Sequence, residues 1–366
     1  MNDEIFMREA LRIARNAEGR TSPNPLVGAV IVKDGKIIAE GWHRKAGTPH
    51  AEIHALKMAG ELAKDATLYV TLEPCSHTGR TPPCTKAIIN AGIKKVVAAM
   101  GDPNPKVAGR GFEMLKNAGI EVEVGLLEEE ARKLNEIFLK WVTTGLPFVT
   151  MKFASSLDGK IATTIGESQW ISCEESRIFT HHLRDRHDAI LVGFGTILAD
   201  NPSLTTRLVE GKNPVRVIVD SSARTPLDSK VVTDKSARTI IAVTRNAPKE
   251  KITALENSGV EIIIAGNKER VDLKNLMKKL AKREITSVLV EGGGTIHFSM
   301  LSAGLVDKIY AFIAPKIIGG LNALPAVAGL GFKKLSDAVA LENFTAEKIG
   351  EDILLSGYIK EDLNSK

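Results

Sequence analysis

The sequence predicts an α/β protein made of two domains. The chain has 366 residues, about twice the ~150 residues of an average domain. Its 43% hydrophobic and 25% charged residues are typical of globular proteins. In both halves, strand-like segments alternate with helix-like segments, which favours helices layered on a sheet. A short stretch of helix-breaking residues separates the two halves.

The first half begins with a helix and a hairpin. Apolar residues recur at helical spacing over 3–18, and S-P-N-P at 22–25 ends this helix. Two strand-like runs follow, and Asp34-Gly35 between them supplies the positive φ of a tight turn. Strands are expected at 27–32, 36–40, 67–72, 94–99 and 120–124, and further helices near 52–62, 83–91, 109–118 and 127–140.

The second half repeats this alternation after the breaker Thr143-Thr144-Gly145-Leu146-Pro147. We therefore expect one domain over 1–145 and another over 146–366. Strands are expected at 148–155, 189–192, 215–220, 239–244, 260–264 and 287–290. Two more strand-like runs, 308–314 and 352–359, are typical of antiparallel edge strands. The two halves share no motif, so no internal repeat is expected.

One histidine and two cysteines of the first half form the pattern of a catalytic metal site. His50-Ala51-Glu52 is followed by Cys75 and, nine positions later, by Cys84. One imidazole and two thiolates give Zn²⁺ three ligands and leave its fourth position for water. Zinc lowers the pKa of such a water towards ~7. Glu52 can then carry a proton from the water to a leaving amine.

Other interpretations of these residues stay open. His50 and the cysteines could meet in a core by chance, or form a closed structural zinc site with His54 or His77 as the fourth ligand. The spacing of His50 and His54 also resembles the metalloprotease pattern H-E-x-x-H, but Ala51 stands where that pattern needs its glutamate. Asn24, between two prolines, either hydrogen-bonds a pyrimidine edge or only shapes a turn.

The motifs around these residues resemble a known family. H-x-E followed by P-C and a second cysteine resembles the cytidine/deoxycytidylate deaminases, although eight residues (SHTGRTPP) separate the cysteines here. Four motifs narrow the resemblance to the deaminase half of the bifunctional riboflavin-biosynthesis deaminase/reductase: SPNPLVGAV at 22–30, GWHRKAGTPHAE at 41–52, LEPCSHTGRTPPC at 72–84 and DPNP at 102–105. It implies a cytidine-deaminase-like α/β/α layered domain. His77 and Arg80 in the insert are candidates for contacting a polar or phosphorylated substrate.

A glycine-rich turn and three motifs characterise the second half. Gly292-Gly293-Gly294 lies between a strand-like run and a helical stretch, where it either lets a pyrophosphate approach a helix N-terminus or only makes a tight turn. MKFASSLDGKIA at 151–162, SQWIS at 168–172 and GTILADNPSLTTR at 195–207 resemble the reductase half of the same family. The resemblance implies a dihydrofolate-reductase-like α/β domain that uses NADPH.

The resemblance also implies roles for individual residues. Positions that match cofactor contacts are Ala154, Trp170, Thr196, Asp200, Ser222 or its neighbour Ser221, Gly293, Gly294, Thr295, Ile296, His297, Phe298 and Ser299. Positions that match substrate contacts are Ser168, Arg184, Leu204, Arg207 and Glu291. Arg184 and Arg207 can clamp a phosphate with their planar forks, and Lys152 is the candidate for placing a charge beside the reacting ribose. Alternatively, Arg184 lies on a solvated helix face and Trp170 is a core aromatic.

Two positions depart from the family pattern. Cys173 and Phe194 stand where smaller residues are expected, which changes packing near the cofactor without removing a reacting group. Cys173 is expected to be a buried structural thiol. Thr244-Arg245 is the candidate for binding the extra phosphate of NADPH, and an arginine that is merely exposed is the alternative.

Composition and charge exclude several classes of protein. No apolar run reaches the ~18 residues of a membrane span, and the acidic start MNDEIFMREA is unlike a signal peptide, so a cytoplasmic enzyme is expected. Three cysteines are too few for a disulfide framework. The net charge of +5 is spread among mixed charges, which suits a phosphorylated small molecule and predicts neither a nucleic-acid nor a membrane partner. A homo-oligomer is left open.

We therefore expect a bifunctional enzyme of riboflavin biosynthesis. The first domain would hydrolytically deaminate 2,5-diamino-6-(5-phosphoribosylamino)pyrimidin-4(3H)-one. The second would reduce the ribose of 5-amino-6-(5-phosphoribosylamino)uracil to the ribityl group with NADPH. One alternative is a tRNA-editing deaminase with an RNA-binding C-terminal module, which needs a basic face studded with aromatics, whereas only 5% of residues are aromatic. Another is a zinc-stabilised scaffold in which Glu52 has no function.

Overall fold

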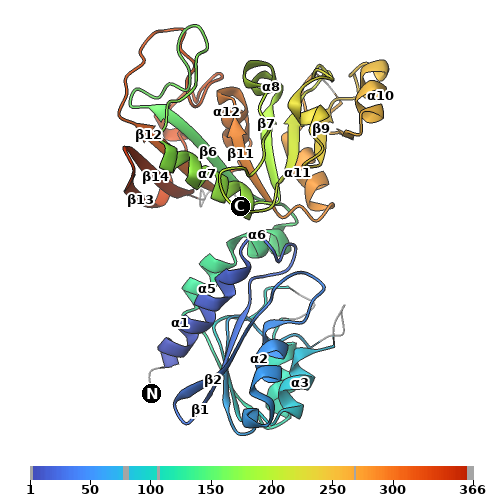
Figure 1. Ribbon diagram of the computed structural model, residues 1–366, viewed down its shortest axis with the longest axis vertical. Helices are drawn as coiled ribbons and strands as arrows, with labels where there is room; N and C mark the ends of the chain where they lie inside the picture. Colours follow the sequence, from blue (N-terminus) through green and yellow to red (C-terminus); the bar gives the residue numbers. More distant parts are fainter. Residues whose placement is uncertain (1–2, 77–81, 105–107, 268, 361–366) are drawn as a thin grey trace. The chain divides into compact units, whose positions relative to one another are not determined.

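Two separate β-sheets organise the chain (Figure 1). The structure, a computed structural model, describes residues 3–76, 82–104, 108–267 and 269–360. The chain divides into two units, Met1–Leu146 and Pro147–Lys366.

The first unit contains a five-stranded sheet in the order β2-β1-β3-β4-β5. β1 is antiparallel to β2 and β3, whereas β3, β4 and β5 are parallel. The β1–β2 turn has φ of 51° at Asp34 and 73° at Gly35, as the Asp-Gly pair predicted. The strands are β1 (Gly28–Lys33), β2 (Lys36–Trp42), β3 (Thr67–Val70), β4 (Lys95–Ala98) and β5 (Glu121–Val124).

Helices cover both faces of this sheet, so the expected α/β/α layering is present (Figure 1). Successive strand residues point to opposite faces: Ala29 and Ile31 pack with α2, α3 and α4, and Val30 and Val32 pack with α1 and α5. The helices are α1 (Asp3–Ala14), α2 (Ala51–Ala59), α3 (Cys84–Asn90), α4 (Arg110–Asn117), α5 (Glu128–Leu134) and α6 (Glu136–Thr144), with the 3-10 turns η1 (Arg15–Ala17) and η2 (Gly60–Ala63).

The single helix expected at 127–140 is wrong, because α5 and α6 are separate helices that meet at Asn135. The side chain of Asn135 is buried. Its Oδ1 accepts from the Leu26 N–H at 2.8 Å and its Nδ2 donates to the Leu26 carbonyl at 3.0 Å. This pairing with a distant loop stabilises the break, and helical periodicity alone does not reveal it.

The second unit contains a nine-stranded sheet in the order β10-β9-β8-β7-β11-β6-β12-β14-β13. The seven strands from β10 to β12 are parallel, and β14 and β13 complete the sheet in antiparallel pairs. The strands are β6 (Phe148–Ser156), β7 (Ala189–Gly193), β8 (Val215–Val219), β9 (Thr239–Val243), β10 (Glu261–Ile264), β11 (Ser287–Gly292), β12 (Lys308–Ala314), β13 (Leu341–Ile349) and β14 (Asp352–Ile359).

The expectation of edge strands at 308–314 and 352–359 is wrong in part. β12 and β14 are antiparallel to each other, but both are interior, and β13 forms the edge. β13 was not expected from the sequence. Seven of its nine residues are exposed, so burial imposes no apolar alternation on it.

Helices pack on the parallel part of the second sheet (Figure 1). A core cluster joins β7, β8 and β9 to α8, α9 and α10 through residues such as Ile190, Ile218, Ile241, Val231 and Leu255. The helices are α7 (Glu174–Arg186), α8 (Phe194–Asp200), α9 (Lys230–Thr233), α10 (Lys249–Asn257), α11 (Leu273–Ala281) and α12 (Gly294–Ser302), with the 3-10 turn η3 (Leu335–Asp337).

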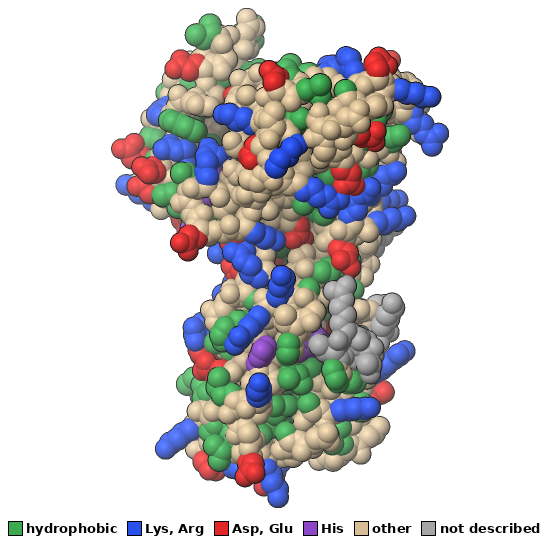
Figure 2. Space-filling view, turned by 45° about the vertical axis from the view of Figure 1, so that its right-hand side comes forward, with side chains coloured by type: hydrophobic (Ala, Val, Ile, Leu, Met, Phe, Trp, Pro, Cys, Tyr) green, Lys and Arg blue, Asp and Glu red, His purple; other side chains and the backbone are tan. Residues whose placement is uncertain are grey.

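The surface carries mixed charges. Figure 2 shows acidic and basic side chains interspersed over the face in view. Within the described ranges, every helix is too short or too polar to cross a lipid bilayer.

Candidate active sites

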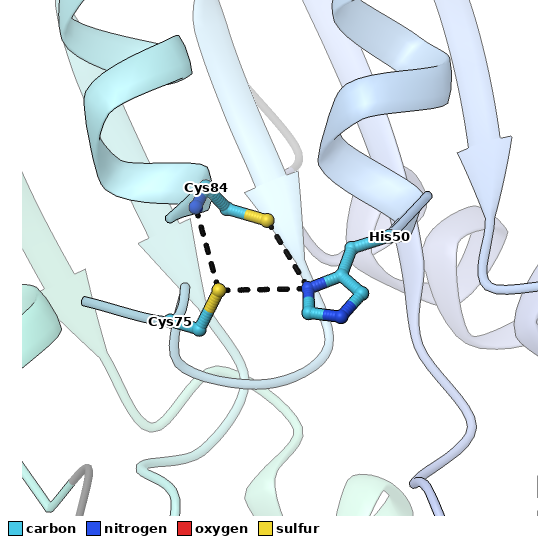
Figure 3. A group of neighbouring side chains, drawn as sticks. All are labelled: His50, Cys75 and Cys84. Carbon is cyan, nitrogen blue, oxygen red and sulfur yellow. Dashed lines mark hydrogen bonds between the residues drawn. The ribbon is translucent and has the colours of Figure 1, made fainter. Parts of the chain in front are cut away.

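Three side chains converge in the first unit, as their residue types predicted. The Nδ1 of His50 lies 3.5 Å from the Sγ of Cys75 and 3.3 Å from the Sγ of Cys84 (Figure 3). The three ligand atoms all lie within 4.8 Å of one another. This spacing allows one ion to contact all three, and one imidazole with two sulfurs is a donor set that Zn²⁺ favours.

Backbone geometry explains how these side chains meet. His50 is the N-cap of α2 and Cys84 is the first residue of α3, so two helix starts face each other across the site. Gly41 on β2 permits this placement, since a Cβ there would overlap the carbonyl oxygen of Ala51. The sheet and the start of α2 therefore lie in direct backbone contact, which fixes His50 and Glu52.

Glu73 was missed by the sequence analysis, and it anchors the loop that leads to Cys75. Its buried carboxylate accepts from the backbone N–H groups of Asp102 at 3.2 Å, Gly109 at 3.0 Å and Gly111 at 2.8 Å. This glutamate ties the segment after β3 to the segment before α4. The sequence shows only that an acidic residue stands directly before Pro74-Cys75. The spacing of the motif does not reveal that this residue binds backbone N–H groups of another segment.

The electrostatics of the cluster fit a cation. The adjacent Cys84 thiol, with further hydrogen bonds from His50 and the Cys84 N–H, lowers the pKa of Cys75 to about 4. The neighbouring Cys75 and burial raise the pKa of Cys84. One thiolate therefore forms readily, and the second is stabilised only by an added positive charge. Burial also raises the pKa of Glu52, which lies against Cys84.

A hydrogen-bonded chain leads from Asn24 to the start of α2. The Nδ2 of Asn24 lies 3.1 Å from the Nε2 of His43, and the Nδ1 of His43 lies 3.3 Å from the carbonyl oxygen of Pro49. The His43 ring also packs edge-on against His50, with 5.3 Å between ring centroids. Asn24 is thus held beside the three candidate metal ligands His50, Cys75 and Cys84. His77 and Arg80 lie outside the described residues.

The second unit contains a cavity of about 1100 Å³. It opens where the parallel strands β6, β7, β8 and β11 end, as is usual for ligand sites in open α/β sheets. The predicted residues that line it are Lys152, Ala154, Ser168, Trp170, Arg184, Thr196, Asp200, Arg207, Ser221, Ser222, Glu291, Gly293, Gly294, Thr295, Ile296, His297 and Ser299. Trp170 is 58% exposed, so it is no core aromatic.

Two predicted site residues do not line this cavity. Leu204 is 3% exposed and packs in the core with Ile190 and Ile197. Phe298 stacks edge-on against Phe332, with 5.3 Å between ring centroids. Their side chains contribute to packing rather than to the wall of the cavity.

A buried ion pair occupies one end of the cavity. The Nε and Nη2 of Arg184 each donate to the Glu291 carboxylate at 2.7 Å, and Nη1 donates to the Thr205 carbonyl at 2.9 Å. Although burial opposes it, Arg184 holds the pKa of Glu291 below its usual value. Phosphate binding by Arg184 therefore stays a prediction, and in this structure the Nε and Nη2 of its fork donate to Glu291.

Lys152, His181 and Arg207 lie at the same end of the cavity. Burial lowers the pKa of Lys152, whose Nζ lies 5.4 Å from the centroid of the Phe312 ring. Burial, with the charges of Arg184 and Arg207, lowers the pKa of His181 to about 4. His181 was not predicted as a site residue.

The glycine turn forms part of the cavity wall. Gly293 is the N-cap of α12 and has φ of 76°, which favours glycine. A Cβ on Gly294 would lie 2.5 Å from the carbonyl oxygen of Pro325. Glycine is therefore required at both positions for steric reasons. The turn also presents the N–H groups of the first turn of α12, which have no partner within the helix and can bind an anion.

Arg224, after β8, and Arg270, after β10, also line the cavity, whereas Thr244 and Arg245 do not line it. The Cζ of Arg224 lies 4.1 Å from the centroid of the Phe194 ring. Phe194, which is bulkier than the family pattern predicts, thus packs its ring against the Arg224 guanidinium.

Cys173 is half-buried at the start of α7, with its Sγ 3.3 Å from the Ile349 carbonyl oxygen.

Comparisons with known proteins agree with both halves. Residues 1–100 match the family model of the cytidine and deoxycytidylate deaminase zinc-binding region, and residues 147–355 match the RibD C-terminal domain. The riboflavin biosynthesis protein RibD of Aquifex aeolicus is 48% identical over 96% of this chain and 97% of that protein. The chain belongs to the RibD family. The Escherichia coli RibD is 44% identical over 97% of this chain and 99% of its own length.

Solved RibD structures share the fold over the whole chain. Acinetobacter baumannii RibD matches with a TM-score of 0.88 and 40% identity, covering 98% of this chain and 99% of that chain. A Thermotoga maritima deaminase/reductase matches with a TM-score of 0.86 and 41% identity, covering 98% of both chains. Membership in the RibD family confirms the predicted fold and the bifunctional deaminase and reductase activity in riboflavin biosynthesis, with zinc and NADPH as cofactors. The tRNA-editing alternative is not favoured.

Proposed function

We propose that this enzyme deaminates a diaminopyrimidinone that carries a phosphoribosylamino group and then reduces the ribose of the resulting uracil. The Thermotoga relative is described as a diaminohydroxyphosphoribosylaminopyrimidine deaminase and 5-amino-6-(5-phosphoribosylamino)uracil reductase. Residues 1–145 would carry the deaminase and 146–366 the reductase, in the cytoplasm. The observation that carries the proposal is the convergence of His50, Cys75 and Cys84 beside a buried glutamate.

In the deaminase site, His50, Cys75 and Cys84 hold the metal. Zn²⁺ in such a site supplies a Lewis acid that makes water nucleophilic at neutral pH. Glu52 takes a proton from the attacking water and delivers it to the amine nitrogen as the C–N bond breaks. Asn24, fixed by His43, orients the pyrimidine by hydrogen bonds to its edge.

In the reductase site, the cavity walls hold both ligands. NADPH supplies the hydride. The glycine turn and α12 bind its pyrophosphate, while Ala154, Trp170, Thr196, Asp200 and Ser222 contact the rest of it. Lys152 and Glu291 line the cavity, where Lys152 would stabilise the negative charge on the ribose ring oxygen as its bond to C1′ breaks, before that oxygen takes up a proton. Positioning of the two reacting carbons accounts for much of the rate.

Arg224 and Arg270 distinguish NADPH from NADH in this proposal. Both line the cavity, as do Ser221 and Ser222, and the residue after Arg270, Val271, donates its N–H to the Ser221 Oγ. Arginine side chains bind phosphate by charge-assisted hydrogen bonds. They replace Thr244-Arg245 as the candidates for binding the extra phosphate of NADPH.

The test is a direct assay of both reactions on the full-length protein. Wild type should release ammonia from the diaminopyrimidinone phosphate and oxidise NADPH with the deaminated product. Glu52→Gln should lower ammonia release by at least about 100-fold and leave NADPH oxidation unchanged. Equal ammonia release by wild type and variant would refute the role of Glu52 and support a purely structural zinc site.

A further inference from the structure

The hydrogen bonds of His181 define which of its ring nitrogens carries the proton. Its Nδ1 accepts from the backbone N–H of Arg207 at 2.9 Å and of Leu208 at 3.3 Å. A nitrogen that accepts two N–H groups bears no proton, so the proton of the neutral ring is on Nε2. The side chain is 3% exposed and lines the cavity. His181 therefore presents an N–H donor at the substrate end.

This donor faces another donor. The Nε2 of His181 lies 3.5 Å from the Nη1 of Arg184, and a guanidinium has no acceptor. The two nitrogens cannot hydrogen-bond each other, whereas one oxygen placed between them would accept from both. Arg184 uses Nε and Nη2 on Glu291 and one Nη1 proton on Thr205. The second Nη1 proton is left for such an oxygen.

The positive charge at this end of the cavity also favours binding of an anion. Glu291 neutralises Arg184 through their paired hydrogen bonds. Arg207 lies nearby, and within the described part of the chain no carboxylate forms an ion pair with it. Lys152 adds further positive charge to the same wall when it is protonated. The site therefore combines an excess of positive charge with donors that lack an acceptor.

We propose that His181 determines specificity in the reductase site: as a neutral donor, its Nε2–H binds the substrate's phosphate together with Arg207 and the Nη1 of Arg184. This inference rests on the reductase function proposed above. It differs from the usual phosphate-binding histidine, which contributes a positive charge. It also explains why a histidine is useful here, because one ring can hold the 207–208 backbone through Nδ1 and donate to the ligand through Nε2.

Two substitutions separate these two tasks. In His181→Asn the amide oxygen can take the place of Nδ1 and keep the 207–208 backbone, but no donor reaches the position of Nε2. In His181→Gln the longer side chain can place an amide N–H near the position of Nε2, but the acceptor for the backbone is lost. His182→Asn is the matched control, since His182 is the exposed neighbour on α7 and does not line the cavity.

The kinetic test uses full-length protein and the deaminated substrate, with and without its phosphate. His181→Asn should raise KM for the phosphorylated substrate by about 10- to 100-fold, the value of a hydrogen bond to a charged group. KM for NADPH and the kinetics of the dephosphorylated substrate should stay at wild-type values. His181→Gln should retain more of the preference for the phosphorylated form than His181→Asn, and His182→Asn should match wild type.

Three results would overturn the inference. Unchanged KM for the phosphorylated substrate in His181→Asn would show that no donor acts there. An equal loss with both forms of the substrate would assign His181 a structural role only. A raised KM for NADPH alone would place the cofactor's phosphate, not the substrate's, at this end of the cavity.

A binding measurement keeps this test independent of the proposed reaction. Nitrogen NMR of the imidazole rings, assigned by the signal lost in His181→Asn, should show the Nε2–H form of His181. Addition of inorganic phosphate should shift that signal in wild type. A proton on Nδ1, or no response to phosphate, would refute the inference. If wild type fails to oxidise NADPH with the uracil substrate, the proposed function fails while the phosphate site is still tested.

Discussion

Lowering the pH from 8 to 5 is expected to destabilise the second unit through His187. This histidine follows α7 and is 5% exposed. Its Nδ1 donates to the Leu183 carbonyl at 2.7 Å, and its Nε2 accepts from the Thr150 hydroxyl at 2.9 Å. The neutral ring thus satisfies both partners. A second ring proton would meet the hydroxyl as a competing donor.

The magnitude follows from the difference between the folded and unfolded pKa. Burial, with smaller effects of the charges of Lys212 and Lys308, lowers the pKa of His187 from 6.5 to about 4, although the hydrogen bond to the Leu183 carbonyl and the charge of Asp188 oppose this shift. Between these values the unfolded chain binds more protons than the folded one, so stability falls as the pH falls through this window. At pH 5 the loss relative to pH 8 is about 2 kcal/mol, since each tenfold ratio of protonation is worth about 1.4 kcal/mol.

The assay compares urea unfolding of full-length wild type and His187→Asn at several pH values between 8 and 5. Pulse proteolysis gives the fraction of the second unit that is folded at each urea concentration. Asparagine can still donate to the Leu183 carbonyl but cannot be protonated. The variant can be less stable at pH 8, yet its stability should fall by about 2 kcal/mol less than that of wild type on the way to pH 5.

His182→Asn is again the control, because His182 is exposed and should give the wild-type pH dependence. The reasoning is refuted if wild type and His187→Asn lose stability in parallel from pH 8 to pH 5. Parallel curves would mean that the folded state accommodates the charged ring without loss of either hydrogen bond.

Three further predictions concern the sites. Removing metal with a chelator should abolish ammonia release and spare NADPH oxidation, and zinc should restore the lost activity; metal analysis should find one ion per chain. Arg224→Ala should raise KM for NADPH by about 10- to 100-fold while KM for NADH stays within about twofold, measured by initial rates. Gly41→Ala should destabilise the first unit by about 1–3 kcal/mol and lower ammonia release, because its Cβ overlaps the Ala51 carbonyl; unchanged thermal unfolding would contradict this packing argument.

Local patterns predicted the alternation of strands and helices because most of the parallel strands are buried and therefore strongly apolar. Local patterns did not predict the break between α5 and α6 at Asn135, because the hydrogen-bond partner of Asn135, Leu26, lies 109 residues away in the sequence. β13 shows a second limit. Its exposed residues carry no alternation, and only pairing with β14 makes it a strand.

The metal ligands were predictable because few residue types bind zinc and their chemistry restricts the combinations. The arginines that we propose for binding the extra phosphate of NADPH, Arg224 and Arg270, were harder to predict, because several exposed arginines follow strands. The sheet order β10-β9-β8 brings the loops after β8 and β10 together, and Ser221 Oγ accepts from the Val271 N–H at 3.2 Å. Arg224 and Arg270 thus line the same cavity, a result of topology rather than of any local motif.

The ion pair of Arg184 and Glu291 is best explained by the ligands that share the cavity. A buried ion pair gives little stability compared with well-packed apolar side chains, yet these side chains are only 11% and 9% exposed. The pair removes the net charge of Arg184 and fixes its Nη1 beside His181. In the proposed site, the phosphate of the substrate meets the charge of Arg207, that of Lys152 when it is protonated, and directed N–H donors, rather than the full charge of Arg184. That arrangement favours recognition by geometry over retention by charge, which suits a product that must leave with its phosphate still attached.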